Sequence, residues 1–486
     1  MTHDNPHHER RWWILGALII AQLMIVLDAT IVNIALPSAQ ADLGFSNEDR
    51  QWIITAYSLA FGALLLLGGK LGDLFGRKRM LIVGLVGFAL ASAIGGAAQS
   101  FTMLAASRAL QGVFAALLAP AVLSLLTTTF TESRERNQAF GIFGGVLACG
   151  ASVGLLLGGV LTQWFDWRAV MYVNVPIAIG AVAAVVFYIA ESRETSKSRI
   201  DVAGVITVTL GLFAVVFGFS NAETEGWGDA LTIGSLGGGV VLLGLFIWIE
   251  SRVANPLLPL RVLLDWNRGG AYLTMAIAGI AMFGTFLFLT YYLQGIMGYS
   301  PIRTGAAFLP MTIVLMVTAI GASTVLRPRF GPRPLVATGM ALGAAGMVLL
   351  SRLGVNASYA VDVVPALLLS GLGMGLVFSS AANNATYGVR PEDASVASAT
   401  TNASQQIGGS LGAALLSTVA ATATADYMSS HSTSSDLVAQ ATVHGFTTGF
   451  AWSAAIFAIG AVVALVTFRK SAPTGLEVSS EPVLVH

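Results

Sequence analysis

Long apolar runs constrain this chain more than any other feature of its sequence. Runs of about 20 residues, the length that an α-helix needs to cross a bilayer, recur along its whole length. No run shows the strict alternation of a barrel strand, and a helix satisfies its own backbone hydrogen bonds in lipid. The sequence therefore predicts an all-α polytopic membrane protein. The fourteen expected spans are approximately 12–37, 50–70, 80–99, 103–128, 138–163, 168–190, 201–220, 229–250, 270–293, 304–326, 333–353, 362–386, 395–425 and 443–468.

The composition agrees with a membrane protein and argues against several other classes. Only 10% of the residues are charged and 55% are hydrophobic, whereas soluble domains average about 25% charged residues. The formal net charge is +0, so nothing indicates nucleic-acid binding. The single cysteine, Cys149, cannot form an internal disulfide, and its apolar surroundings favour a packed small hydrophobic side chain.

The cations divide unequally between the two sides of the predicted membrane. If the N-terminus is cytoplasmic, twenty of the 25 Lys and Arg residues fall in cytoplasmic loops, span ends or tails. Four lie outside, at Arg50, Arg168, Arg303 and Arg352, and Arg108 is left within a span. Because cytoplasmic loops are enriched in cations, this bias predicts a plasma-membrane protein with both termini in the cytoplasm.

A short pattern repeats at matching places in two parts of the chain. Phe75-Gly76 follows the second span, and Phe330-Gly331 follows the tenth. Two parallel six-helix bundles with a site between them form a transporter architecture. The predicted organisation is a cytoplasmic tail (1–11), a six-helix bundle (12–190), an inserted helix pair with a cytoplasmic linker (191–269), a second six-helix bundle (270–468) and a cytoplasmic tail (469–486). Within the linker, residues 256–264 are too short to span and are expected at the interface.

Four motifs resemble those of a known transporter family. Gly69-x-Leu71-x-Asp73-x-x-Gly76-Arg77-Lys78 resembles the loop signature of the major facilitator superfamily. The segments at 27–37, 108–112 and 167–176 resemble motifs of its fourteen-span drug:proton antiporters, which include QacA-like and EmrB-like exporters. The resemblance implies a major facilitator fold, with two inserted helices, and a multidrug efflux function.

Asp28 is the most informative single residue, because a carboxylate within a span is costly and functional by default. Counting the rise of a helix, Asp28 lies about 13 Å below the outer end of its span and Arg108 roughly 9 Å below its own. The two could share a depth, and contact between them is left open. One reading is a static ion pair. The other is a proton-binding carboxyl, and the resemblance implies that the acid and the arginine serve coupling and substrate recognition.

The loop between the second and third spans invites a different role. Gly69 and Gly76 predict a tight turn, and Arg77 and Lys78 hold the topology. The resemblance implies that Asp73 latches the two bundles on the cytoplasmic side. Its expected partners are the start of the thirteenth span, near Ser395, and Arg136. A simple solvated turn is the alternative.

The fifth span carries Gly150, Gly154 and Gly158 at intervals of four, followed by Gly159. Small residues at this spacing let helix backbones approach closely, so tight packing is sufficient to explain them. The antiporter version of this span has Pro after the middle glycine, where this chain has Leu155. That departure weakens the antiporter inference from this motif and keeps a proton symporter open as an alternative.

Polar and aromatic side chains in the spans are candidates for a substrate cavity, and each fits ordinary hydrogen bonding between helices equally well. They are Gln22, Asn33, Tyr57, Gln111, Tyr291, Tyr292, Asn383, Asn384, Asn402, Gln405 and Gln406. The aromatic residues Phe283, Phe286 and Phe288 could line the cavity or face lipid, and the lipid-facing reading is favoured. No span in the second bundle contains a central acid, so selection for dications has no visible second anion.

The sequence predicts a proton-coupled antiporter that exports hydrophobic small molecules, which could be cationic. There is no phosphate-binding loop, so ATP does not drive transport directly, and no catalytic constellation indicates an enzyme. No metal site or cofactor is expected; protons are the coupling ion. The expected partners are small hydrophobic substrates and the lipid bilayer, without nucleic acid, and the protein is expected to act as a monomer. The alternatives are an exporter of one metabolite and, less favoured, a proton symporter for uptake or a sensor.

Overall fold

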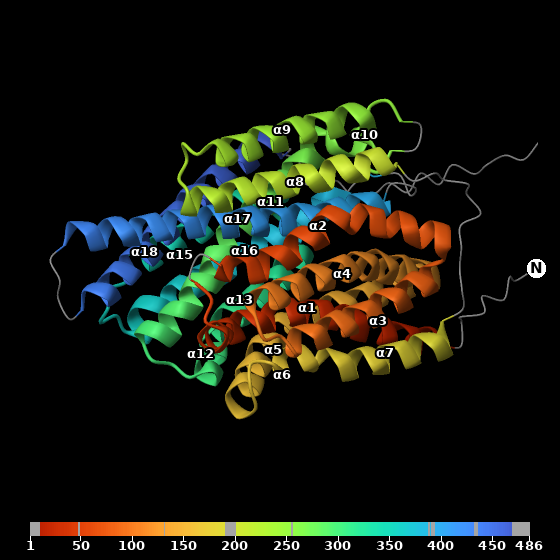
Figure 1. Cartoon of the computed structure of the whole chain (residues 1–486). Helices are drawn as coiled ribbons and strands as arrows, with labels where there is room; N and C mark the ends of the chain where they lie inside the picture. Colours follow the sequence, from red (N-terminus) through yellow and green to blue (C-terminus); the bar gives the residue numbers. More distant parts are fainter. Residues whose placement is uncertain are drawn as a thin grey trace, which may run out of the picture.

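The computed structural model describes residues 10–46, 49–130, 132–189, 201–253, 256–386, 389, 394–431 and 436–468. Within these ranges every regular element is a helix, and most helices run side by side along one direction (Figure 1). Thirteen helices there are long and apolar enough to cross a membrane. A further one, α5, is a 32-residue helix whose apolar described part is 153–164. The predicted all-helical membrane fold is confirmed.

The first part of the chain forms seven helices. They are α1 (Arg11–Leu43), α2 (Arg50–Phe75), α3 (Arg77–Gly96), α4 (Phe101–Thr129), α5 (Ser133–Trp164), α6 (Ala169–Tyr172) and α7 (Asn174–Tyr188). The short α6 and the longer α7 follow each other around Val173 and together make one span. Helix α1 continues past Pro37, the predicted end of its span, and stops where Gly44 adopts a φ of 66°.

The later helices include an inserted pair and several interrupted spans. They are α8 (Val202–Thr224), α9 (Ala230–Glu250), α10 (Leu260–Leu263), α11 (Trp266–Tyr291), η1 (Tyr292–Ile296), α12 (Pro301–Ala307), α13 (Leu309–Gly321), η2 (Ala322–Leu326), α14 (Arg327–Phe330), α15 (Pro332–Leu350), η3 (Tyr359–Val363), α16 (Val364–Thr386), α17 (Ala394–Ser430) and α18 (Leu437–Thr467). Helix α8 packs against α9, α17 and α2. Helix α9 lies at the edge of the molecule (Figure 1), where Val240 and Val241 are 65% and 69% exposed. The domain boundaries remain a prediction.

The repeated Phe-Gly pattern forms the same kind of turn twice. Helix α2 ends at Phe75, and Gly76 has a φ of 103° with its N–H donating to the carbonyl of Gly72. Helix α14 ends at Phe330, and Gly331 has a φ of 76°. Glycine adopts such backbone conformations without steric cost, which explains the residue at both places. The side chains of Asp73, Arg136 and Ser395 lie outside the described part, so the predicted latch remains a prediction.

The glycines of α5 bring its backbone close to two different neighbours. A Cβ atom at Gly154 would lie 2.0 Å from Thr30 Oγ1 of α1, so a larger residue there would have to displace the Thr30 side chain. Gly150 and Gly158 also face α1. By contrast, a Cβ at Gly159 would lie 2.7 Å from the Cα of Ile302 in α12. The predicted close packing is present, and Gly159 extends it to the second group of helices.

The expectation that the phenylalanines of α11 face lipid is wrong. Phe283 and Phe288 are buried, and Phe286 packs against the same core. The ring of Phe288 stacks on that of Phe446 with 5.5 Å between centroids. It fits because Gly449 has no side chain, where a Cβ would lie 2.4 Å from the Phe288 ring. Lipid and protein core are both apolar, so the sequence did not separate the two faces of α11.

Candidate functional site

Asp28 of α1 is completely buried and fully hydrogen-bonded. Its Oδ2 accepts a 2.5 Å hydrogen bond from NH1 of Arg108 on α4, where the two residues form an ion pair. Its Oδ1 accepts from Gln111 Nε2 at 2.9 Å and from Asn174 Nδ2 at 2.8 Å. The exposed fraction is 0% for Asp28 and 1% for Arg108. A buried carboxylate is tolerated only when paired and hydrogen-bonded in this way, so α1, α4 and α7 meet at one charged centre.

Ser92 of α3 is hydrogen-bonded to two of the side chains that contact Asp28. Ser92 Oγ of α3 accepts from Gln111 Nε2 and from Asn174 Nδ2, each at 2.9 Å, and donates to the carbonyl of Met171. Gln111 Oε1 in turn accepts from Arg108 NH1 at 2.7 Å. The Oδ1 of Asn174 is buried without a hydrogen-bond partner in the described part of the chain. The five side chains form what we call the Asp28 network: Asp28, Ser92, Arg108, Gln111 and Asn174.

Helix α2 fixes the guanidinium of Arg108 from the other side. Arg108 Nε donates to the carbonyl of Ile53 at 3.1 Å, and the guanidinium carbon lies 4.4 Å from the centre of the Tyr57 ring. Gly112, one turn along α4, permits this approach, because a Cβ there would lie 2.4 Å from the carbonyl oxygen of Tyr57. The arginine thus has a fixed position even before its contact with Asp28 is counted.

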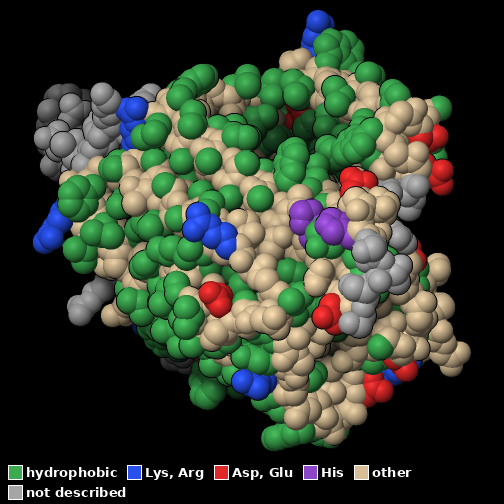
Figure 2. All heavy atoms as spheres, turned by 90° about the vertical axis from the view of Figure 1, so that its left-hand side faces the viewer, with side chains coloured by type: hydrophobic (Ala, Val, Ile, Leu, Met, Phe, Trp, Pro, Cys, Tyr) green, Lys and Arg blue, Asp and Glu red, His purple; other side chains and the backbone are tan. Residues whose placement is uncertain are grey.

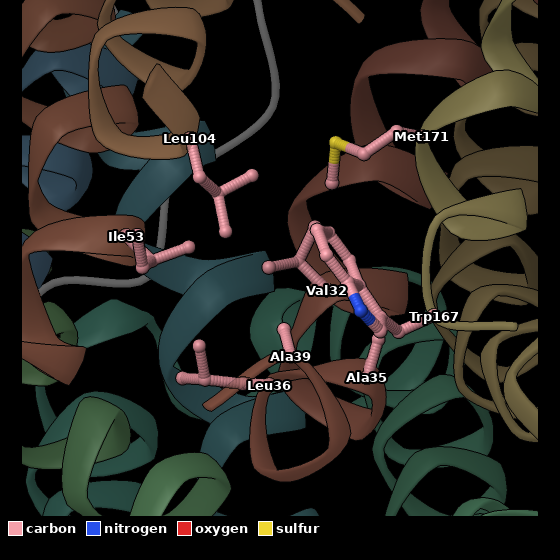
Figure 3. A pocket seen from close by; sticks show the side chains of 8 residues that line it. All are labelled: Val32, Ala35, Leu36, Ala39, Ile53, Leu104, Trp167 and Met171. Carbon is pink, nitrogen blue, oxygen red and sulfur yellow. The ribbon is translucent and has the colours of Figure 1, made fainter. Parts of the chain in front are cut away.

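An apolar pocket adjoins the Asp28 network. Val32 lies one turn beyond Asp28 on α1, and Leu104 lies one turn before Arg108 on α4. Figure 3 shows these side chains and the indole of Trp167 surrounding the same space. The cavity of about 10 Å³ has room for one water at most. Its complete lining is Val32, Ala35, Leu36, Ala39, Ile53, Leu104, Trp167 and Met171. These apolar side chains separate Asp28 from the end of the bundle that we expect to face outside.

At that same end, side chains join the two groups of helices. Tyr291 of α11 donates its hydroxyl to Gln40 Oε1 of α1 at 2.6 Å, and Gln294 Nε2 donates to the carbonyl of Ile34 at 3.1 Å. The guanidinium of Arg50 lies 4.5 Å from the centre of the Tyr291 ring. Figure 2 shows this end of the molecule, where charged side chains are scattered between hydrophobic and uncharged ones. We call these the outer contacts, and they hold α1 and α2 against α11 and η1.

The structure distributes the predicted cavity residues over several environments. Gln111 and Tyr57 belong to the surroundings of Asp28 and Arg108, and Tyr291 belongs to the outer contacts. Tyr292 donates to the carbonyl of Gly354, and Asn33 donates to that of Ala29 in its own helix. The remaining candidates are placed as follows: Gln22, Asn402, Gln405 and Gln406 are half-buried, Asn383 is exposed, and Asn384 is hydrogen-bonded to Asn267. For all of these candidates a cavity role remains a prediction.

Two members of the Asp28 network were missed as site residues. Asn174 stands within the motif at 167–176, so its position was visible but its role was not. Ser92 is one small polar residue in an apolar helix, and nothing in its neighbourhood marks it. The motif could therefore have identified Asn174 as a site residue, whereas Ser92 is identified by the structure alone.

Replacing Asn174 by Leu should destabilise the protein by about 1–3 kcal/mol, because Asp28 Oδ1 and Ser92 Oγ each lose a buried donor. The measurement is the melting temperature of the purified protein in detergent. Asn33→Leu is the matched control, since among the described residues Asn33 Nδ2 donates to carbonyls of α1 itself. Equal melting temperatures for the two variants would show that the bonds of Asn174 contribute nothing.

Membrane-spanning helices that meet at a buried ion pair fit the class of membrane transporters. The family model of the Major Facilitator Superfamily matches residues 18–413, so the chain belongs to this family. It is a transporter and not an enzyme. Its relatives include the puromycin resistance protein pur8 of Streptomyces alboniger, 47% identical over 476 residues, which cover 98% of this chain and 94% of pur8.

Two further comparisons agree with this assignment. The cephamycin export protein CmcT of Amycolatopsis lactamdurans is 39% identical over 408 residues, covering 83% of this chain and 84% of CmcT. The crystal structure of the nucleoside transporter NupG matches with a TM-score of 0.64, covering 94% of this chain and 100% of NupG. At 9% sequence identity, the likeness to NupG concerns the fold alone.

Proposed function

We propose that this protein is a proton-coupled antiporter that exports hydrophobic antibiotics or drugs across the plasma membrane, as a monomer with both termini in the cytoplasm. The observation that carries the proposal is Asp28, a carboxyl with 0% exposure inside a span and in contact with Arg108. Ionisable groups within spans mark proton and substrate pathways. The names of pur8 and CmcT, a resistance protein and an export protein, support the outward direction.

Protonation of Asp28 changes the forces that hold α1. The ionised carboxylate accepts hydrogen bonds from α4 and α7 and balances the charge of Arg108. A proton on Asp28 removes that balance, and it weakens charge-assisted hydrogen bonds that are about twice as strong as neutral ones. Helix α1 is therefore held less firmly against α4 and α7 when Asp28 carries a proton.

The same helix transmits this change to the outer contacts. Gln40 lies about 18 Å along α1 from Asp28, counting the helical rise, and accepts the hydroxyl of Tyr291. Ile34, between them, accepts from Gln294. The protonation state of Asp28 thus changes how firmly α1 is held, and with it the equilibrium between closed and separated outer ends. In alternating access, α1–α7 then rock against α11–α18, and an inward proton is exchanged for an outward drug.

The proposal leaves two readings of the substrate range: export of many unrelated compounds, or export of a single compound. The names of pur8 and CmcT each refer to one antibiotic, puromycin or cephamycin, which favours an exporter dedicated to one compound as the second candidate. A resistance panel of dyes, biocides and antibiotics in a pump-deficient host separates the two. Protection against many unrelated compounds supports the multidrug reading, protection against one class supports the dedicated exporter, and no protection at all contradicts export of these compounds.

Locking α5 to α12, a further contact between the two groups of helices, should stop transport. Gln163 Oε1 of α5 accepts from the backbone N–H of Ile302 in α12 at 3.3 Å. In a Cys149→Ala background, Gln163→Cys with Ile302→Cys should be joined by a short bis-methanethiosulfonate crosslinker, which should reduce drug efflux to background, with recovery on reduction. Each single cysteine variant is the control. Full efflux by the crosslinked protein would contradict a cycle in which these ends separate.

A further inference from the structure

Two acidic side chains lie buried at one end of the inserted helix pair, away from the Asp28 network. Asp201 precedes the first residue of α8 and is 7% exposed, and Glu250 is the last residue of α9 and is 3% exposed. This is the end of the pair that we expect to face the cytoplasm. Neither residue has a part in the proposed exchange at Asp28. Burial of two carboxyl groups is costly unless something compensates their charge.

One oxygen of each carboxyl has a defined partner. Asp201 Oδ1 accepts from the backbone N–H of Gly204 at 2.9 Å, which caps α8. Glu250 Oε2 accepts from the backbone N–H of Leu258 at 2.9 Å, which ties the segment before α10 to the end of α9. Leu258 is itself buried, at 6% exposed. These bonds fix both carboxyl groups in place.

The other two oxygens converge on one spot. Asp201 Oδ2 and Glu250 Oε1 are buried, and neither has a hydrogen-bond partner among the described residues. A Cβ atom on Gly204 would lie 2.5 Å from the first and 2.7 Å from the second. The absence of a side chain at Gly204 therefore leaves room beside α8 for both unpartnered oxygens.

No described cation compensates this pair. From α8 the facing group is Asp201, from α9 it is Glu250, and the segment before α10 contributes backbone N–H groups. Among the described residues, no Lys, Arg or His forms an ion pair with either acid, and Arg252 lies over the ring of Trp248. Two buried carboxylates so close together cannot both remain ionised at low cost, whereas a proton between them makes a strong O–H···O⁻ hydrogen bond.

We propose that Asp201 and Glu250 bind and share one proton, forming a second proton-binding site at the end of the α8–α9 pair. The proton bonds to one oxygen of the pair and is accepted by the other, so the site carries a single negative charge. Because Glu250 also holds Leu258, the shared proton fastens the inserted pair to the segment that leads through α10 into α11. Without it, repulsion between the two carboxylates would loosen that attachment.

Infrared spectroscopy of the full-length protein in lipid nanodiscs tests the proposal. We expect a C=O stretching band of a protonated carboxylic acid at neutral pH that disappears in Glu250→Gln and equally in Asp201→Asn, since the proton belongs to the pair. Both changes are conservative: Gln retains an acceptor for Leu258, and Asn retains a helix cap. Asp229→Asn is the matched control, because Asp229 caps α9 at its other end with backbone donors on its carboxyl, and it should leave the band unchanged.

Two results would overturn the proposal. The first is a band that persists in both Glu250→Gln and Asp201→Asn. The second is a wild-type protein without such a band at neutral pH. If its melting temperature also rises on addition of Mg²⁺ or Ca²⁺, and that rise is lost in both variants, the pair binds a metal ion instead. If one variant does not fold, the loss or persistence of the band in the other decides. Because the infrared band is measured without transport, the result tests the shared proton independently of the exchange proposed at Asp28.

Discussion

Replacing Asp28 by Asn should reduce substrate-driven proton movement to the level of protein-free vesicles while leaving the protein folded. Asn has nearly the same size and keeps an acceptor oxygen for Arg108 NH1, the donor that now lies 2.5 Å from the carboxylate. It cannot take up or release a proton in the physiological range, so the exchange step is lost. Proteoliposomes containing a pH-sensitive dye measure the effect, with substrate added to wild type and variant at equal protein content.

Asp42→Asn is the matched control for this experiment. Asp42 lies on the same helix and also accepts from an arginine, with Arg168 NH1 at 2.7 Å from its Oδ2. Its side chain is 47% exposed, however, and it is not part of the Asp28 network. We expect coupled proton movement to survive this change. Undiminished movement in Asp28→Asn would remove Asp28 from the mechanism and leave it with a structural role.

Replacing Arg108 by Leu should cost about 3–5 kcal/mol of stability, the largest effect that we expect on folding. The change leaves Asp28 as a buried anion without a countercharge, and it also removes the bonds to Ile53 and Gln111. The measurement is the melting temperature of the purified protein in detergent, with membrane expression level as a second readout.

A double variant separates the charge from the packing. Asp28→Asn combined with Arg108→Leu contains no buried unpaired charge, so it should melt well above Arg108→Leu alone. The remaining deficit then reflects lost packing on the Tyr57 ring, over which the guanidinium now lies. If the single and double variants melted at the same temperature, the ion pair would contribute little, and its central place in this account would be contradicted.

The helical fold could be predicted because the bilayer imposes a length and an apolar composition on every span. The same physical reasoning placed Asp28 and Arg108 at a similar depth, since the rise of a helix is constant. It also predicted the turn at Gly76, whose φ of 103° suits glycine.

The surroundings of the ion pair could not be predicted, because a span that is apolar on all sides carries no signal for the direction of its faces. Ser92 and Asn174 lie next to Asp28 only because α3 and α7 turn those faces inward. Phe288 was misplaced for the same reason: lipid and protein core attract the same side chains. The carboxyl pair of Asp201 and Glu250 was also invisible, since its members are 49 residues apart and meet only through the packing of α8 on α9.

The most direct test of proton exchange at Asp28 is the proton balance of substrate binding in weakly buffered detergent solution. With a pH indicator present, addition of a transported drug to the wild-type protein should release protons, and the same addition to Asp28→Asn should release none. Equal proton release by both proteins would contradict the assignment of the exchanged proton to Asp28.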